Sequence, residues 1–240
     1  MSHGRYLLTL TLIYVLFWGA LAVSPYNRHD WALENVLVLA AAIILGGTYR
    51  LLMLSRISYT LIFVFLCLHA IGAHYTYAQV PYDTWYQALT GESLGWERNH
   101  FDRLVHFSYG LLLAYPIREM ILRVAAMSGF WGYFFPLDIT MSTSMIYELI
   151  EWLAAELFGG DLGVAFLGTQ GDVWDAHKDM ALASLGALIA MLITAALNFY
   201  LQRDFAREWL SSLAIKRKQP LGEDELIRLW RKKQAGRNEV

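Results

Sequence analysis

Charged residues are scarce in this sequence, and cysteine is almost absent. Of the 240 residues, 57% are hydrophobic and only 17% are charged, and the mean hydropathy is +0.37. A soluble domain of this length carries about 45–50% apolar and about 25% charged residues. The deficit of charge therefore argues against a soluble globular protein and indicates an integral membrane protein.

Several kinds of functional site also lack the residues they need. Cys67 is the single cysteine, which excludes an intramolecular disulfide and a thiolate metal site. No serine-nucleophile elbow, P-loop or zincin His-Glu-x-x-His pattern is present. The net charge is −2, and no basic groove or nucleic-acid motif is found, so nucleic acid is not an expected partner.

Long hydrophobic segments are what the sequence does contain, and a helix needs about 20 apolar residues to cross a bilayer. They predict an all-α polytopic membrane bundle of about six transmembrane helices, at Tyr6–Ser24, Trp31–Tyr49, Ile57–Ala78, Asp102–Met127, Phe130–Phe158 and Asp179–Leu201. In the fifth segment Pro136 suits a first helical turn, with Phe130–Phe135 as an interfacial collar before it. The first segment also fits a signal peptide, but its length favours an uncleaved helix.

Two parts of the chain follow from this pattern. Residues 1–201 are predicted to form the transmembrane domain, and residues 202–240 a basic tail with a short amphipathic helix in Glu223–Lys233. If the N-terminus is cytoplasmic, fifteen of the nineteen Lys and Arg residues fall on the cytoplasmic side and four fall outside. The positive-inside rule therefore predicts an inner-membrane protein with both termini in the cytoplasm.

Acidic and histidine residues are expected to gather at the outer face, where the predicted topology places the starts of two helices and the end of another. They come as pairs at helical spacing: Asp102 with His106, Glu148 with Glu151, and Asp175 with Asp179. Residues three or four apart lie on one helix face, and the last pair aligns if its helix begins at Asp175. Asp102 and Asp175 also suit helix capping. The two glutamates do not, because they approach a helix C-terminus, where the macrodipole opposes negative charge.

Three explanations of this cluster are open. Carboxylates with imidazole suit Mg²⁺, Ca²⁺, Mn²⁺ or Zn²⁺, and such a divalent cation would activate water or hold a lipid phosphate at the outer leaflet. In the first explanation, all six residues are ligands, and Asp102, His106, Glu148 and Glu151 also act as general acids or bases. The second is a small proton-coupled transporter, and the third is a structural cluster that joins the helices. The oligomeric state is not predicted.

Three motifs carry a family resemblance. Asp-Arg-Leu-Val-His-Phe (102–107), Tyr-Glu-Leu-Ile-Glu-Trp (147–152) and Gly-Thr-Gln-Gly-Asp-Val-Trp-Asp-Ala-His-Lys-Asp-Met (168–180) resemble the signatures of the YjdF-like family of uncharacterised bacterial inner-membrane proteins. More distantly, Asp102, His106, Glu148 and Asp179 match motif positions of VanZ-like membrane proteins. That second resemblance implies a role at the cell envelope, with an envelope lipid or intermediate as partner.

Overall fold

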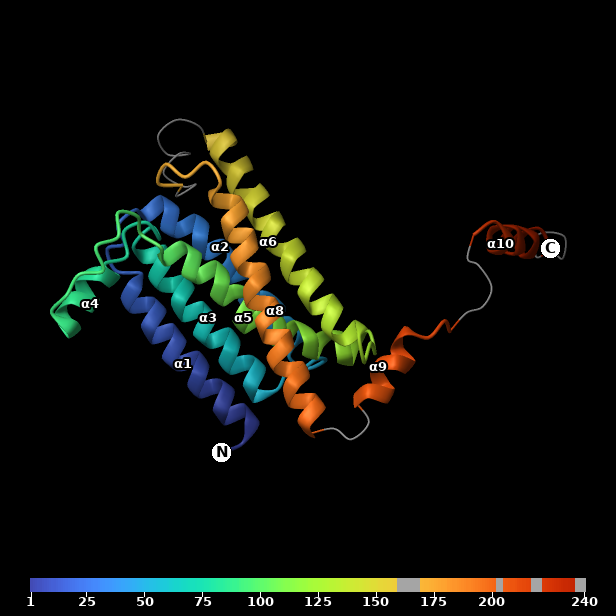
Figure 1. Ribbon diagram of the computed structural model, residues 1–240. Coiled ribbons are helices and arrows are strands. Elements are labelled where there is room, and N and C mark those ends of the chain that lie inside the picture. Colours follow the sequence, from blue (N-terminus) through green and yellow to red (C-terminus); the bar gives the residue numbers. More distant parts are fainter. Residues whose placement is uncertain (159–168, 202–204, 217–221, 236–240) are drawn as a thin grey trace.

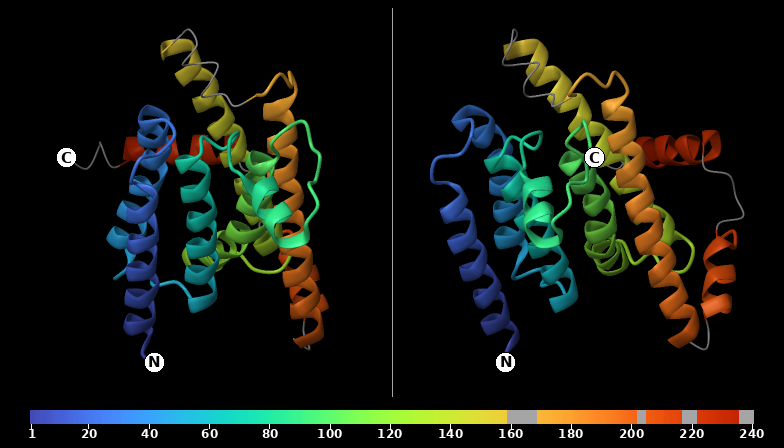
Figure 2. Two further views of the ribbon diagram at one scale, coloured as in Figure 1. Left: turned by 90° about the vertical axis from the view of Figure 1, so that its left-hand side faces the viewer. Right: turned by 60° about the vertical axis from the view of Figure 1, so that its left-hand side comes forward.

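The computed structural model describes residues 1–158, 169–201, 205–216 and 222–235. These residues form helices and connecting loops, with no strand among them. Six long helices build the bundle seen from three sides in Figures 1 and 2: α1 (His3–Leu21), α2 (Arg28–Thr48), α3 (Arg56–His74), α5 (Phe101–Val124), α6 (Trp131–Phe158) and α8 (Asp175–Leu201). The shorter helices are α4 (Tyr82–Thr90), α9 (Phe205–Leu213) and α10 (Glu223–Ala235).

The long helices have the dimensions of membrane spans. Four of them, α1, α2, α3 and α8, combine the length and the hydropathy of a span. With 24 and 28 residues, α5 and α6 extend about 36 and 42 Å, more than the hydrocarbon core of about 30 Å. Successive long helices alternate in direction, so the N-terminus and the end of α8 lie at the same end of the bundle (Figure 1). The prediction of a polytopic all-α membrane protein is confirmed.

Side-chain caps explain where helices start. The Asn27 side chain accepts the backbone N–H of His29 at 2.9 Å and begins α2. At the start of α3, the Ser55 hydroxyl accepts the N–H of Ser58 at 3.2 Å. The carboxylate of Glu119, from α5, accepts the Ser55 N–H at 2.9 Å. Glu119 therefore fixes the start of α3 against α5 at the end of the bundle opposite to the start of α5.

The expectation of an interfacial collar before Pro136 is wrong, because α6 begins at Trp131 and Pro136 lies buried inside the helix. Aromatic packing explains the earlier start. The Phe130 ring packs edge-on against Trp209 of α9 with centroids 5.4 Å apart, and the Phe130 N–H donates to the Ser212 hydroxyl at 2.9 Å.

Helix α9 was not predicted from the sequence. Of the expected tail, residues 202–204, 217–221 and 236–240 lie outside the described residues.

Small residues let α5 and α8 cross closely at the centre of the bundle. Ala114, Ala183 and Ala187 are completely buried there. A Cβ added to Gly110 of α5 would overlap the carbonyl oxygen of Ala183, and one added to Gly186 of α8 would overlap the carbonyl oxygen of Phe107. Small residues at a helix crossing allow the backbones to approach each other, as is common within membranes. This crossing sets the positions of the starts of both helices.

Gly110→Ala is therefore expected to destabilise the protein, because the new methyl group has no space at the crossing. Overpacking of this kind costs about 1–3 kcal/mol. The matched control is Gly46→Ala on α2, where no atom lies within 4 Å of the new Cβ. Thermal unfolding in detergent should show a lower melting temperature for Gly110→Ala and an unchanged or higher one for Gly46→Ala. Equal melting temperatures would contradict close packing of α5 on α8.

Candidate functional site

Acidic and histidine residues from three helices meet at one end of the bundle. Helix α5 places Asp102 and His106 one turn apart near its start. Helix α8 already begins at Asp175, so Asp175 and Asp179 share one face, which was the condition for their predicted alignment. Because α8 packs against both α5 and α6, these residues come near Glu148 of α6.

His106 lies at the centre of this group. Its Nε2 atom is 3.5 Å from the Asp102 Oδ1 atom and 3.5 Å from the Glu148 Oε1 atom. One donor atom each from Asp102, His106 and Asp179 lies within 4.8 Å of the others. Asp179 is only 2% exposed, and the Glu148 side chain is 9% exposed. The Asp102 side chain is 20% exposed. The three carboxyl groups and the imidazole thus form a compact and largely buried cluster, which we call the acidic cluster.

Two oxygen atoms of the acidic cluster lack a hydrogen-bond partner. Within the described residues, both Glu148 Oε1 and Asp179 Oδ1 are buried without a donor. Burying a polar atom without a partner costs roughly 1–3 kcal/mol, and more for a charged group. Native structures rarely accept this cost without a reason such as a bound ion, a water molecule or a proton. These two atoms therefore call for a proton, a water molecule or a bound ion.

The donor set fits a divalent cation. An ion bound at 2.0–2.6 Å can accept donors that are about 4–5 Å apart on opposite sides of it. The spread of up to 4.8 Å among Asp102, His106 and Asp179 falls in this range. Carboxylate oxygens with one imidazole suit Mn²⁺ and Zn²⁺ among the divalent cations, and carboxylates alone suit Mg²⁺ and Ca²⁺. These three residues could hold a metal ion.

Asp175 lies beside the cluster in a second group of charges. Its Oδ1 atom pairs with Arg98 at 2.5 Å and with Arg103 at 3.4 Å. Arg103 also pairs with Asp172 at 2.5 Å, and Lys178 pairs with Asp172 at 2.6 Å. Hydrogen bonds from the Lys178 ammonium group and from the Trp174 N–H lower the pKa of Asp172 to about 2. In the described chain, the ion pairs of both arginines thus go to aspartates outside the acidic cluster.

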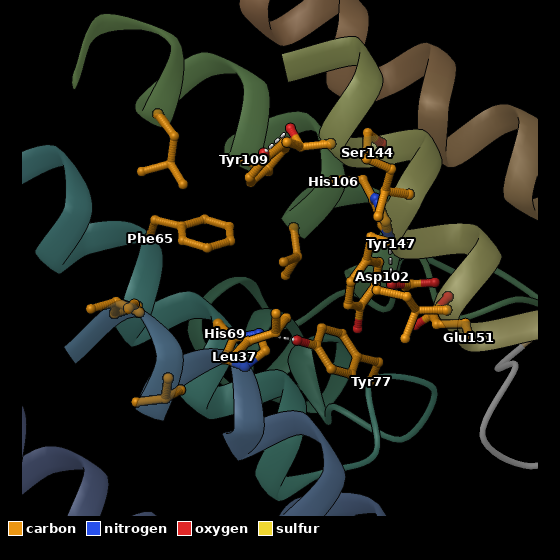
Figure 3. Close-up of a pocket in the computed structure, with 18 of the residues that line it drawn as sticks. Leu37, Phe65, His69, Tyr77, Asp102, His106, Tyr109, Ser144, Tyr147 and Glu151 are labelled. Carbon is orange, nitrogen blue, oxygen red and sulfur yellow. Dashed lines mark hydrogen bonds and ion pairs between the residues drawn. The ribbon is translucent and has the colours of Figure 1, made fainter. Parts of the chain in front are cut away.

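Glu151 lies one turn beyond Glu148 and lines two cavities. The first cavity has a volume of about 320 Å³, and its lining includes Glu148, Asp175 and Asp179. We call it the acidic cavity. The second, of about 330 Å³, lies between α2, α3, α5 and α6 (Figure 3). Asp102 and Glu151 line both cavities. Both side chains therefore stand at the junction of the two cavities.

Sequence reasoning missed a buried polar chain beside the acidic cluster. Glu34 of α2, 7% exposed, accepts a hydrogen bond from the Tyr147 hydroxyl at 3.2 Å. The Glu34 carbonyl oxygen lies 3.1 Å from His69 Nε2, and the Tyr77 hydroxyl lies 2.5 Å from His69 Nδ1. Since a carbonyl only accepts, Nε2 carries the proton and Tyr77 donates to Nδ1. A carboxylate inside the apolar run of α2 was the signal that could have identified Glu34.

The fold and the cluster define a multi-pass helical membrane protein with a buried acidic site at one end. The chain belongs to the family described as "Predicted membrane protein (DUF2238)", whose model matches residues 6–199. It is 39% identical over 189 residues to "Inner membrane protein YjdF" of Escherichia coli (strain K12), covering 78% of this chain and 86% of that protein. No solved structure matches the chain.

These comparisons confirm the resemblance to the YjdF-like family. The protein is a multi-pass inner-membrane protein. The similarity to VanZ-like proteins stays a prediction.

The charged group at Asp172 generates a pH prediction. The ordinary pKa of 3.8 falls to about 2 in the folded protein, so the carboxylate stabilises the fold fully above about pH 5 and loses this effect as the pH falls toward 2. Asp172→Asn should therefore lower the melting temperature at pH 7, and its difference from the unsubstituted protein should shrink between about pH 5 and pH 3. Thermal unfolding followed by tryptophan fluorescence measures this difference, with the exposed Glu92→Gln as control. A difference that stays constant down to about pH 3 would refute the ion-paired state of Asp172.

Proposed function

We propose that the acidic cluster binds a divalent cation and engages the head group of a lipid or envelope intermediate in the outer leaflet. The observation that carries this proposal is the pair of unpartnered buried oxygens, Glu148 Oε1 and Asp179 Oδ1. A bound cation would satisfy both atoms and neutralise the carboxylates around it. It would supply a Lewis acid that holds a phosphate oxygen or activates water.

Each residue then has a distinct role. Asp102, His106 and Asp179 are the proposed ligands, with Glu148 as a fourth through the oxygen that faces His106. Glu151, at the junction of the two cavities, is the proposed general acid or base toward a bound head group. Asp175 has its Oδ1 atom occupied by two arginines, so its proposed role is to hold these guanidinium groups beside the cation rather than to bind the metal.

The shape of the second cavity favours this function over a proton-coupled carrier. A carrier needs a polar path that continues toward the opposite membrane face. The carboxyl groups that line this cavity lie beside the acidic cluster, while the deeper part is lined by apolar residues such as Ile62 and Leu113 and by hydroxyl groups that carry no charge. The described cavities therefore support binding at one face.

Mn²⁺ binding tests the proposal directly. Purified protein should bind Mn²⁺ saturably, and Asp179→Asn should weaken this binding at least tenfold, because it removes one of the three closest donors. The control Glu92→Gln changes an exposed carboxylate at the same end of the bundle and should leave the affinity within twofold. Electron paramagnetic resonance of free Mn²⁺ during a titration gives both affinities.

The same titration distinguishes a structural cluster. If no variant binds Mn²⁺ saturably and Asp179→Asn changes only the melting temperature, the cluster joins helices and the proposed cation site is wrong. His106→Gln provides a second variant, because its amide NH2 group can donate hydrogen bonds to the neighbouring carboxyl oxygens while the imidazole ligand is lost.

The orientation of the site forms part of the proposal, since an outer-leaflet ligand requires a periplasmic site. In a Cys67→Ser background, Glu92→Cys at the site end should react with a membrane-impermeant maleimide in intact spheroplasts. Arg50→Cys, between α2 and α3 at the opposite end, should react only after the membrane is permeabilised. Mass shifts of the labelled protein measure both reactions. The reverse pattern would place the site in the cytoplasm and exclude an outer-leaflet ligand.

A further inference from the structure

The second cavity has a lining that changes from polar to apolar along one direction. Figure 3 shows Asp102, His106, Tyr147 and Glu151 gathered on one side of it and Phe65 on the other. On α5 the lining residues follow one helix face, from Asp102 at the polar end to Leu113 at the apolar end. Farther along the cavity the Tyr109 and Thr143 hydroxyls bond to each other at 2.6 Å, so a ligand that fills the cavity meets carboxyl groups at one end and mainly apolar side chains along the rest. We call this cavity the tail groove.

The length of the tail groove matches one leaflet of a bilayer. Eleven residues separate Asp102 from Leu113, which corresponds to about 16 Å along the helix axis. The hydrocarbon core of a bilayer is about 30 Å thick, so the tail groove covers about half of it. Its polar end lies at the start of α5, which the predicted topology places at the level of the lipid head groups. The apolar end lies at the depth that lipid chains occupy.

Of the described helices around the tail groove, α2 and α6 are the neighbours that do not pack closely on each other. Around the tail groove, α2 packs on α3, α3 on α5, and α5 on α6, whereas α2 and α6 do not pack closely on each other in the described chain. At the polar end the gap is bridged by the hydrogen bond from Tyr147 of α6 to Glu34 of α2. From this hydrogen bond toward its apolar end, the cavity lies within the expected membrane-spanning segments, where lipid surrounds the helices.

We infer that the tail groove binds one aliphatic chain of a phospholipid, which enters between α2 and α6 with its head group at the acidic cavity. Continuity supports this occupant, because Asp102 and Glu151 line both the groove and the acidic cavity. The chain would contact Phe65, Leu66 and Leu113, and the head group would reach the hydroxyls of Tyr77 and Tyr147. The position of the head group rests on the proposed function, whereas binding of the chain depends only on the groove.

Two neighbouring alanines of α2 provide a matched test. Ala41 lines the tail groove, while Ala42 is exposed on the outside of the same helix. Ala41→Trp fills the groove with an indole ring, whereas Ala42→Trp places the same ring in the surrounding lipid. Delipidated protein would be titrated with dioleoyl phosphatidylglycerol and observed by native mass spectrometry. We expect one saturably bound lipid, a loss of at least fivefold in the bound fraction for Ala41→Trp, and less than a twofold change for Ala42→Trp.

Equal lipid binding by the two variants would overturn the inference. If Ala41→Trp fails to fold, the pair Ala41→Leu and Ala42→Leu makes the same comparison with a smaller side chain. A lipid-free dimer that only Ala41→Trp disrupts would also overturn the inference, because a second copy of the chain would then occupy the groove.

Mn²⁺ affinity, measured on the same samples, separates this inference from the proposed function. Lipid binding that is sensitive to Ala41→Trp but occurs without any Mn²⁺ binding would support the tail groove and refute the cation site. Mn²⁺ binding without any bound lipid would support the cation site and refute the tail groove.

Discussion

The arrangement of this protein depends on burying carboxyl groups at the end of a membrane bundle without a fixed positive partner for each of them. Asp102, Glu148 and Asp179 surround one imidazole, and two of their oxygen atoms have no donor among the described residues. Removing a carboxylate from water is costly unless a proton, a cation or a set of donors compensates for it. The nearby guanidinium groups of Arg98 and Arg103 do not provide this compensation, because they pair with Asp175 and Asp172. A bound cation, as we propose, would satisfy this constraint.

Helix α5 connects this constraint to the rest of the molecule. Its first turns carry Asp102 and His106, its middle crosses α8 at Gly110, and its far end caps α3 through Glu119. The close crossing with α8 brings Asp179 to His106, and packing against α6 brings Glu148. The face of α5 that carries Asp102 and His106 continues to Tyr109 and Leu113 and lines the tail groove. In our proposal, one helix therefore joins the head-group site to the groove for the chain, which is the combination an amphiphilic ligand requires.

Much of the fold follows from the sequence, because the bilayer restricts what apolar segments can do. Segments of about 20 apolar residues predicted all six long helices, and pairs at helical spacing predicted which side chains share a face. The start of α6 was misplaced, since the preference of Pro136 for a first turn was outweighed by packing of Phe130 against α9. Helix α9 could not be predicted because its contacts join residues about 80 positions apart.

The proximity of these side chains was predictable from the sequence, but the contacts among them were not. Topology alone brought Asp102, His106, Glu148 and Asp179 toward one end of the bundle. Which acid would pair with an arginine depends on a loop geometry that spacing does not encode, so the ion pairs of Asp175 appeared only in the structure. Glu34 and Tyr147 were missed as partners because their hydrogen bond joins residues 113 positions apart, on α2 and α6.

The most direct test of the cation site is the coordination of bound Mn²⁺ itself. Electron spin-echo envelope modulation of the Mn²⁺-loaded protein in detergent detects nitrogen atoms bonded to the ion. Binding in the acidic cluster predicts coupling to one imidazole nitrogen that disappears in His106→Gln and persists in His29→Gln, whose histidine is exposed near the start of α2. Bound Mn²⁺ without nitrogen coupling, or with coupling that survives His106→Gln, would contradict the central claim.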